Sequence, residues 1–376
     1  MIKKVCMVLV TVFLMTSFIN LSASDFDVDA VSAILIEAST GKVMYEKNAD
    51  SPLPPASVTK VMTMLLVMEA IDGGVIKLSD MVQTSENAAA MGGSQIYLKV
   101  GEEMTVEDML KSVVIASAND SAVALAEFIC GSEEAFVSRM NERAGELGLQ
   151  NTNFENTNGL DDDTVNHVMS ARDIAVITRE LLKHPKILEY SSIWMDTVRN
   201  GEFGLTNTNR LVRFYSGANG LKTGSTSKAK FCISATAKRD GMQLIAIIMA
   251  SSTRDTRNEA AKKLFDYGFA NYSYVNIESG TLDKMRVLGG ITDECGIAYG
   301  SFETVLDKGM EKNIEKTIKL PDNLSAPITL GQKIGTVEYI LNGEKIGEAD
   351  IISCDEVNKI SYFGLLGKLI KKFLII

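Results

Sequence analysis

The stretch that decides the fold reads PASVTK at residues 55–60 and VMTMLLVMEAI at residues 61–71. The second part is apolar on almost every side, which predicts a helix buried in the middle of a domain. Prolines break the chain just before it, and Gly73-Gly74 end it. Ser57 is therefore expected in the first turn of a buried helix, where unpaired backbone N–H groups and the helix dipole favour developing negative charge.

Ser57 and Lys60 lie three residues apart and so share one face of that helix. A lysine whose pKa is lowered by desolvation or by a neighbouring cation can act as the base for a serine nucleophile. The spacing alone does not single out Ser57, and taken by itself the element favours a plain helix cap. Serines with a lysine three residues on occur in the pairs Ser39/Lys42, Ser57/Lys60, Ser225/Lys228 and Ser227/Lys230.

Two further short elements follow along the chain. SAN at residues 117–119 places a hydroxyl and an amide on a turn between predicted helices, where they suit a proton relay and the orientation of a peptide carbonyl. KTG at residues 222–224 comes just before a strand predicted to begin near Lys230. An edge strand can pair with an extended peptide, glycine permits close approach, and lysine and threonine suit a carboxylate. Each tripeptide alone is common by chance.

In this order, the elements together resemble the penicillin-recognising serine D,D-peptidases, and within them the D-alanyl-D-alanine carboxypeptidases of the low-molecular-mass penicillin-binding proteins. The resemblance covers most of the mature chain and rests on PASVTK at 55–60, SAND at 117–120, NGLD at 158–161, GLKTG at 220–224 and an amphipathic C-terminal segment. It implies an α/β (α+β) catalytic domain of the β-lactamase/transpeptidase type, with an antiparallel sheet flanked by helices. A small all-β domain follows.

The resemblance also implies a role for each matching residue. Ser57 would be the nucleophile, Lys60 its base and Ser117 a proton relay. Arg254 is the alternative to Arg257, which is preferred for its spacing to EAAKK at residues 259–263. The substrate-binding residues would be Asn119 for the peptide carbonyl, Lys222, Thr223 and Arg257 for the terminal carboxylate, Gly224 for close approach, and Ser225, whose N–H completes the oxyanion hole with that of Ser57.

The implied reaction removes the terminal D-alanine from the peptidoglycan stem peptide by two-step acyl transfer. It needs no metal or organic cofactor, and β-lactam antibiotics would act as covalent inhibitors. Two rivals remain. A class A β-lactamase would carry Asp in place of Ala118 and a loop glutamate, for which Glu155 lacks the expected spacing to a Leu-Asn pair. A non-catalytic wall-binding protein would require one motif to be broken.

Composition narrows the possible partners and metal sites. The net charge of −10 lacks the basic surplus that nucleic-acid binding draws on. His167 and His184 are the only histidines, too few for a histidine-rich metal site, and neither is favoured as a catalytic base. Beyond Cys6, the cysteines lack metal-site spacing and favour buried free thiols, with one disulfide left open; they are Cys130, Cys232, Cys295 and Cys354.

The ends of the chain suggest export and membrane attachment. Residues 1–24 have the charged start, short apolar middle and small cleavage residues of a secretory signal, with an uncleaved anchor as the alternative. A catalytic domain is expected at 25–272, a β-rich domain at 273–357 and an amphipathic helix at 358–376. That helix would lie on the outer face of the cytoplasmic membrane, or else dock on the β domain. The lysines facing anionic headgroups would be Lys368, Lys371 and Lys372.

Local patterns predict the elements around the motifs. The residues at 151–166 are rich in Asn, Asp, Thr and Gly and predict an irregular loop. Asp240-Gly241 and Asn342-Gly343 predict tight hairpin turns. The expected elements are a hairpin at 31–37 and 42–46, two or three helices in 106–149, a helix at 171–182, strands at 230–237 and 243–250, a helix at 257–268, and strands at 336–341 and 345–352.

Overall fold

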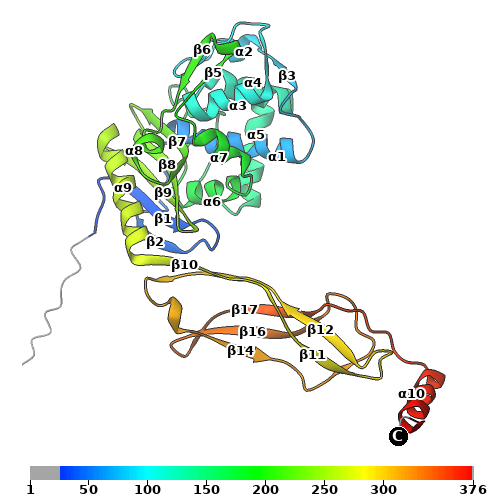
Figure 1. Ribbon diagram of the computed structural model, residues 1–376. Helices are drawn as coiled ribbons and strands as arrows, with labels where there is room; N and C mark the ends of the chain where they lie inside the picture. The colour runs from blue at the N-terminus through cyan, green and yellow to red at the C-terminus, as the bar shows by residue number, and fades with distance from the viewer. Residues whose placement is uncertain (1–25, 375–376) are drawn as a thin grey trace, which may run out of the picture.

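The computed structural model of this protein describes residues 26–374. The signal expected at residues 1–24 lies outside the described residues. Figure 1 shows a larger part, in which helices pack on a sheet, and a slender part made of strands, with a helix at its far end. The fold class expected from the sequence is confirmed.

The larger part is built on a five-stranded antiparallel sheet in the order β2-β1-β9-β8-β7. The N-terminal hairpin pairs through β1 with β9, the last strand of this sheet in the sequence. This order leaves β7 at the opposite edge. The strands are β1 (Ser32–Glu37), β2 (Val43–Lys47), β7 (Ala218–Thr226), β8 (Lys230–Arg239) and β9 (Met242–Ser251).

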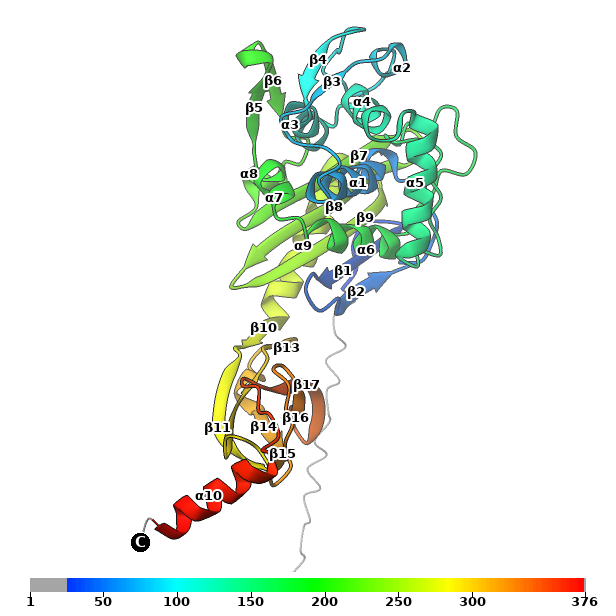
Figure 2. The ribbon, with the colours of Figure 1, turned by 90° about the vertical axis from the view of Figure 1, so that its right-hand side faces the viewer.

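Helices cover both faces of this sheet (Figure 2). α9 (Arg254–Asn271) packs on one face, and α6 (Ala171–Leu181) packs on the other, with α1 (Lys60–Asp72) against α6. β9 is buried on both faces, because Leu244 and Ile248 belong to the core under α9 and Ile247 to the core around α1. α1 is buried except near its C-terminal end, which confirms the prediction from its apolar sequence.

A helical lobe and two short hairpins surround α1. Figure 2 shows these hairpins at one end of the larger part, away from the slender part. The bounds are β3 (Met81–Gln83), α2 (Glu86–Ala89), β4 (Glu103–Thr105), α3 (Val106–Lys111), the π-helical turn η2 (Ser112–Ala116), α4 (Asn119–Cys130), α5 (Glu133–Glu146), α7 (Lys186–Ser191), β5 (Met195–Val198), η3 (Arg199–Gly201), β6 (Phe203–Thr206) and α8 (Leu211–Phe214).

Most predicted elements are confirmed, with shifted ends. The helix predicted from residue 257 starts earlier, at Arg254, because Thr253 caps it through reciprocal hydrogen bonds with Thr256. The helices predicted in 106–149 are α3, α4 and α5. η2 separates α3 from α4 and ends at Ser117, whose φ of 65° breaks the helix.

The slender part holds a six-stranded sheet in the order β14-β16-β17-β12-β11-β15 and a separate pair of β10 and β13. That pair lies next to the larger part, and Lys42 Nζ donates to Val305 O at 2.9 Å across the junction. The elements are β10 (Tyr272–Ile277), β11 (Gly280–Leu288), β12 (Glu294–Tyr299), β13 (Phe302–Asp307), η4 (Glu311–Asn313), β14 (Ile314–Lys319), β15 (Leu324–Ser325), β16 (Lys333–Leu341) and β17 (Glu344–Ser353).

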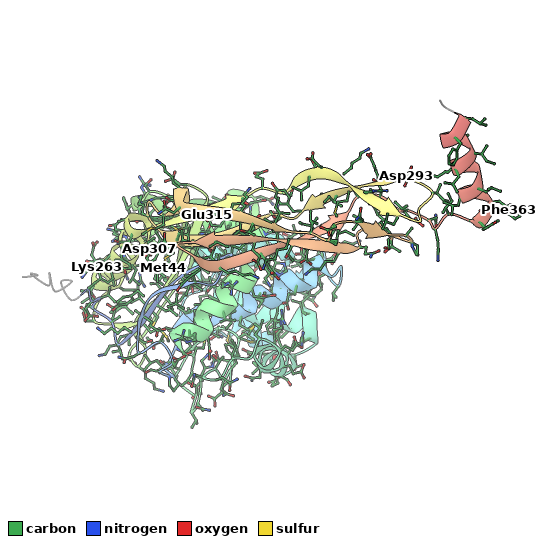
Figure 3. All side chains as sticks on the ribbon, turned by 90° about the horizontal axis from the view of Figure 1, so that it is seen from below. Met44, Lys263, Asp293, Asp307, Glu315 and Phe363 are labelled. Carbon is green, nitrogen blue, oxygen red and sulfur yellow. The ribbon has the colours of Figure 1, made fainter. Side chains whose placement is uncertain are left out.

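The C-terminal helix α10 (Tyr362–Leu374) touches the slender part through a lysine. Lys368 Nζ donates to Gly290 O at 3.2 Å and to Asp293 Oδ1 at 2.7 Å. Figure 3 shows Phe363 at the end of the molecule far from Met44. No helix in residues 26–374 is long and apolar enough to span a membrane.

The expectation of buried free thiols is only partly met. All four cysteines in the described part of the chain are free. Cys232 and Cys295 are buried, as expected. Cys130 is half-buried and Cys354 is exposed, because it follows the last strand at a surface turn.

Candidate active site

Ser57 lies on a tight 3₁₀ turn rather than in an α-helical first turn. This turn, η1 (Ala56–Thr59), leads directly into α1, which begins at Lys60. Ala56 adopts a φ of 49°, a left-handed conformation that a plain helix start does not contain. The predicted position of Ser57 at the mouth of the buried helix is right, but the local conformation was not foreseen. Ser57 is half-buried and lines a cavity.

Lys60 is fully buried beside Ser57. Its Nζ lies 3.0 Å from Ser57 Oγ, 2.5 Å from Asn119 Oδ1 and 2.8 Å from Asn158 O. Burial, and next the nearby charge of Lys222, holds the pKa of Lys60 well below its usual 10.5. In the neutral amine, two hydrogens serve the two carbonyl oxygens, and the lone pair is left for the hydroxyl of Ser57.

Ser117 and Asn119 lie at the break between η2 and α4. Ser117 lines the cavity, and its hydroxyl makes no hydrogen bond to another residue in 26–374. Asn119 is fixed on two sides, because its Nδ2 donates to Gly92 O at 2.7 Å and its backbone N donates to Ser94 O at 2.7 Å. The break therefore presents a free hydroxyl to the cavity and holds the amide of Asn119 against Lys60.

The KTG segment precedes β8, which begins at Lys230 as predicted, but the segment itself lies within the edge strand β7, which was not foreseen. Lys222 is fully buried, and its Nζ donates to Thr223 O at 2.8 Å. Burial and then the charge of Arg257 lower the pKa of Lys222 to about 7. Thr223 Oγ1 donates to Thr208 Oγ1 at 2.8 Å. The edge of the sheet thus brings a lysine and a hydroxyl to the cavity that Ser57 lines.

Gly224 is where the edge strand touches the turn that carries Ser57. A Cβ at Gly224 would lie 2.8 Å from Ser57 N and 2.9 Å from Pro55 O, closer than real Cβ atoms approach. Only glycine lets these two backbone segments lie side by side. The N–H groups of Ser57 and Ser225 consequently belong to adjoining segments, and both residues line the cavity.

Arg254 and Arg257 both line the cavity, which has a volume of about 480 Å³. Arg257 is only 2% exposed, and its guanidinium donates to Asn258 Oδ1 at 2.9 Å and to Cys232 O at 3.4 Å. Burial lowers the pKa of Arg257 to about 10. Arg254 is exposed. The predicted residues that line the cavity directly are Ser57, Ser117, Thr223, Gly224, Ser225 and Arg257, with Lys60, Asn119 and Lys222 buried just behind them.

The chain matches the model of the family described as D-alanyl-D-alanine carboxypeptidase over residues 19–253. The chain belongs to this family. A second model, described as the C-terminal domain of penicillin-binding protein 5, matches residues 296–359. The protein is therefore a D-alanyl-D-alanine carboxypeptidase, a serine hydrolase of the penicillin-binding proteins, as the sequence predicted.

Individual relatives match from 64% to 90% of this chain. The D-alanyl-D-alanine carboxypeptidase DacF of Bacillus subtilis is 45% identical over 90% of this chain and 88% of its own. The crystal structure of penicillin-binding protein 5 from Haemophilus influenzae has a TM-score of 0.76 and 31% identity, and the match covers 89% of this chain and 98% of that one. Penicillin-binding protein D2 of Listeria monocytogenes, in its ampicillin-bound form, has a TM-score of 0.59 and 31% identity over 64% of this chain and 98% of its own.

This carboxypeptidase has a buried support for Ser57 that sequence reasoning missed. Thr59 Oγ1 donates to Ala56 O at 2.8 Å and lies 2.7 Å from His167 Nε2. Glu155 N donates to His167 Nδ1 at 3.0 Å, so the hydrogen of the neutral ring is on Nε2 and points to Thr59. Burial lowers the pKa of His167 to about 4, which keeps the ring neutral. His167 therefore stabilises the turn that carries Ser57, through its hydrogen bond to Thr59, and does not line the cavity.

The loop at 151–166 supplies a second support. Gly159 has a φ of +82°, and a Cβ there would lie 1.9 Å from Ala56 O. Asn158 O accepts a hydrogen bond from Lys60. The NGLD motif thus packs directly under the nucleophile turn, although its sequence shows only a turn signal. Within residues 26–374 no three His, Cys, Asp or Glu side chains are grouped closely enough to hold a metal ion.

Proposed function

We propose that this carboxypeptidase removes the terminal D-alanine from peptidoglycan stem pentapeptides through an acyl-enzyme on Ser57. The observation that carries the proposal is the 3.0 Å between Lys60 Nζ and Ser57 Oγ, with Lys60 buried and its pKa lowered. Neutral Lys60 takes the hydroxyl proton as Ser57 attacks the carbonyl carbon of the penultimate D-alanine.

The reaction proceeds in two steps, which are acylation of Ser57 and hydrolysis of the acyl-enzyme. The carbonyl oxygen gains negative charge and is held by the N–H groups of Ser57 and Ser225, a device worth roughly 3 kcal/mol per donor. The C–N bond breaks, and the departing amine of D-alanine receives a proton through Ser117. Water next attacks the ester, Lys60 takes its proton, and the trimmed peptide leaves as Ser57 regains its hydrogen.

Substrate binding is assigned to the edge strand and the cations beside it. The stem peptide lies along β7 as an added strand, and Gly224 keeps β7 close to the turn of Ser57. Asn119 orients the peptide carbonyl. The terminal carboxylate binds Lys222, Thr223 and Arg257, where charge-assisted hydrogen bonds are strongest.

The same serine is the proposed target of β-lactam antibiotics, since their strained amide presents a carbonyl to the same attack. The ampicillin-bound relative supports this assignment. A β-lactamase is disfavoured, because Ala118 replaces the aspartate of its middle motif. Glu155, the candidate deacylating base, instead accepts hydrogen bonds from Val165 N at 2.8 Å and Asn166 N at 3.0 Å within its own loop.

Two rates measured on purified protein test the proposal. D-Alanine released from a stem pentapeptide should exceed steady-state turnover of benzylpenicillin, and Ser57→Ala should release none. Ser227→Ala is the matched control, since Ser227 also has a lysine three residues on but does not line the cavity. Rapid penicillin turnover without D-alanine release would establish the β-lactamase. Peptide binding without release of D-alanine would establish the wall-binding protein.

We also propose the domain division and the location of the enzyme. Residues 1–24 direct export, 25–272 form the catalytic domain, 273–357 the β-rich domain and 358–376 a membrane-associated helix. Exposed apolar side chains on α10 support attachment to the outer face of the cytoplasmic membrane. Lys368 was expected to face anionic headgroups, but its Nζ donates a hydrogen bond to Asp293. The exposed apolar residues of α10 are Tyr362, Phe363, Leu365, Leu366, Leu369, Ile370, Phe373 and Leu374.

A further inference from the structure

The edge strand β7 presents only part of its length to the active-site cavity. Residues 223–225 line the cavity. Nearer the start of the strand, Ser191 Oγ donates to Asn219 O at 2.6 Å. Asn209 Nδ2 donates to Gly220 O at 2.7 Å. Both side chains are buried, so the first half of β7 is fixed by the fold around it.

The other end of β7 is held by Asp161, a residue of the irregular loop. Its carboxylate accepts a hydrogen bond from Thr226 Oγ1, on the last residue of β7. Its carbonyl oxygen accepts one from Lys228 Nζ, in the turn that follows. Thr226 Oγ1 also accepts from Ala229 N at 2.9 Å, so the same hydroxyl closes the turn between β7 and β8. Asp161 thus fixes the end of the strand that adjoins the oxyanion hole.

Beyond the close contact at Gly224, the end of β7 has little other support. Within residues 26–374, β7 pairs with one strand only, which is β8. The side chains around the strand end, those of Ser225, Ser227 and Lys228, are exposed. Asp161, by contrast, is only 8% exposed. Because a strand end with few buried contacts opens easily, the hydrogen bonds to Asp161 are a large part of what holds it.

The loop that carries Asp161 also touches the other parts of the catalytic machinery. Asn158 O accepts a hydrogen bond from Lys60, and Gly159 packs against the turn that carries Ser57. Asp161 follows two residues later and binds the edge strand. One loop therefore contacts the base, the nucleophile turn and the strand that provides the second donor of the oxyanion hole. An oxyanion hole works only when its donors are aimed at one oxygen, so the relative placement of these segments affects the rate.

We propose that Asp161 is a positioning residue for the oxyanion hole. Through Thr226 it holds the end of β7 so that the N–H of Ser225 lies beside that of Ser57. The inference rests on the proposed function, since it assumes that an acyl-enzyme forms on Ser57. Asp161 does not line the cavity and takes no part in proton transfer. Its loss should slow acylation and hydrolysis of the acyl-enzyme together, because both steps pass through an oxyanion.

The test measures release of D-alanine from a stem pentapeptide by the full chain, with kcat and KM determined separately. Asp161→Ala should lower kcat by about tenfold to 100-fold, the effect of a misplaced oxyanion donor. KM should stay within about threefold, because both steps slow together and Thr223 keeps its own hydrogen bond to Thr208. Asp161→Asn should restore most of kcat, since the amide oxygen can accept the same hydrogen bond from Thr226.

Variants of the partner residue test whether Asp161 acts through it. Thr226→Val should reproduce the loss in kcat, whereas Thr226→Ser keeps the hydroxyl and should not. The double variant Asp161→Ala, Thr226→Val should be no slower than either single variant, because all three lack the same hydrogen bond. Asp163→Ala is the matched control, since it removes an exposed carboxylate from the same loop and should leave kcat unchanged.

Each outcome decides the inference. A wild-type enzyme that releases no D-alanine overturns the proposed function together with this inference. If the wild type is active, a folded Asp161→Ala enzyme that keeps kcat within about twofold overturns the inference alone. A double variant whose losses multiply also overturns it, because the two residues would then act through separate contacts. If urea unfolding shows that Asp161→Ala is not folded, the kcat of Thr226→Val decides by the same criterion.

Discussion

Gly159→Ala should disable the enzyme through the backbone of Ala56. The new Cβ would lie 1.9 Å from Ala56 O, and an ordinary contact begins at 3.4 Å, so the carbonyl or the loop must move by about 1.5 Å. A left-handed alanine costs about 1–2 kcal/mol, and overpacking adds roughly 1–3 kcal/mol. Because Ser57 follows Ala56 directly, a shift of about 1 Å should lower kcat/KM for D-alanine release on the order of 100-fold.

Gly148→Ala is the matched control for this prediction. Gly148 has a φ of +71°, but a Cβ there meets nothing within 4 Å. It carries the backbone penalty of about 1–2 kcal/mol without the clash. Urea unfolding gives the loss of stability for each variant, and D-alanine release gives kcat/KM. A Gly159→Ala enzyme that retains kcat/KM within about twofold of the Gly148→Ala value would refute the packing argument.

Three further predictions follow from single contacts. The KM for the pentapeptide should rise as pH increases through about 7, because Lys222 loses its charge there, and Lys222→Met should remove that rise in a pH series of initial rates. Asp120→Asn should lower the free energy of unfolding in urea by about 1.5–3 kcal/mol, because the buried carboxylate accepts hydrogen bonds from three backbone N–H groups, those of Ile96, Leu98 and Ser121. Asp162→Asn, at an exposed position, should leave the free energy of unfolding unchanged. Thr59→Val should lower the free energy of unfolding by about 1–3 kcal/mol, because it leaves His167 Nε2 and Ala56 O without their hydrogen-bond partner. It should also slow acylation by benzylpenicillin, measured by stopped flow. An unchanged acylation rate would show that the turn carrying Ser57 keeps its conformation without Thr59.

Local sequence predicted the elements whose cause is local. The apolar run of α1 requires burial on every side, and α1 is buried. Asp240-Gly241 and Asn342-Gly343 have positive φ at both residues, as tight hairpin turns require. The motifs resembling a known family also named the residues that meet at the cavity, although neither the 3₁₀ turn that carries Ser57 nor the strand that carries KTG was foreseen.

The features that the sequence did not predict depend on contacts between segments that are distant in the chain. His167 meets Thr59 across 108 residues, and no periodicity in either segment indicates it. Gly159 reads as an ordinary turn glycine until the backbone of Ala56 is placed above it. The extra turn of α9 arises from the cap at Thr253, which lies ahead of the predicted start at residue 257.

The assignment of Ser57 as nucleophile is tested most directly by locating the penicilloyl adduct. Purified enzyme is treated with benzylpenicillin, digested and analysed by mass spectrometry. One adduct is expected, on the peptide that contains Ser57, and Ser57→Ala should carry none while Ser227→Ala labels like the wild type. An adduct on another serine, or a Ser57→Ala enzyme that still labels, would contradict the assignment.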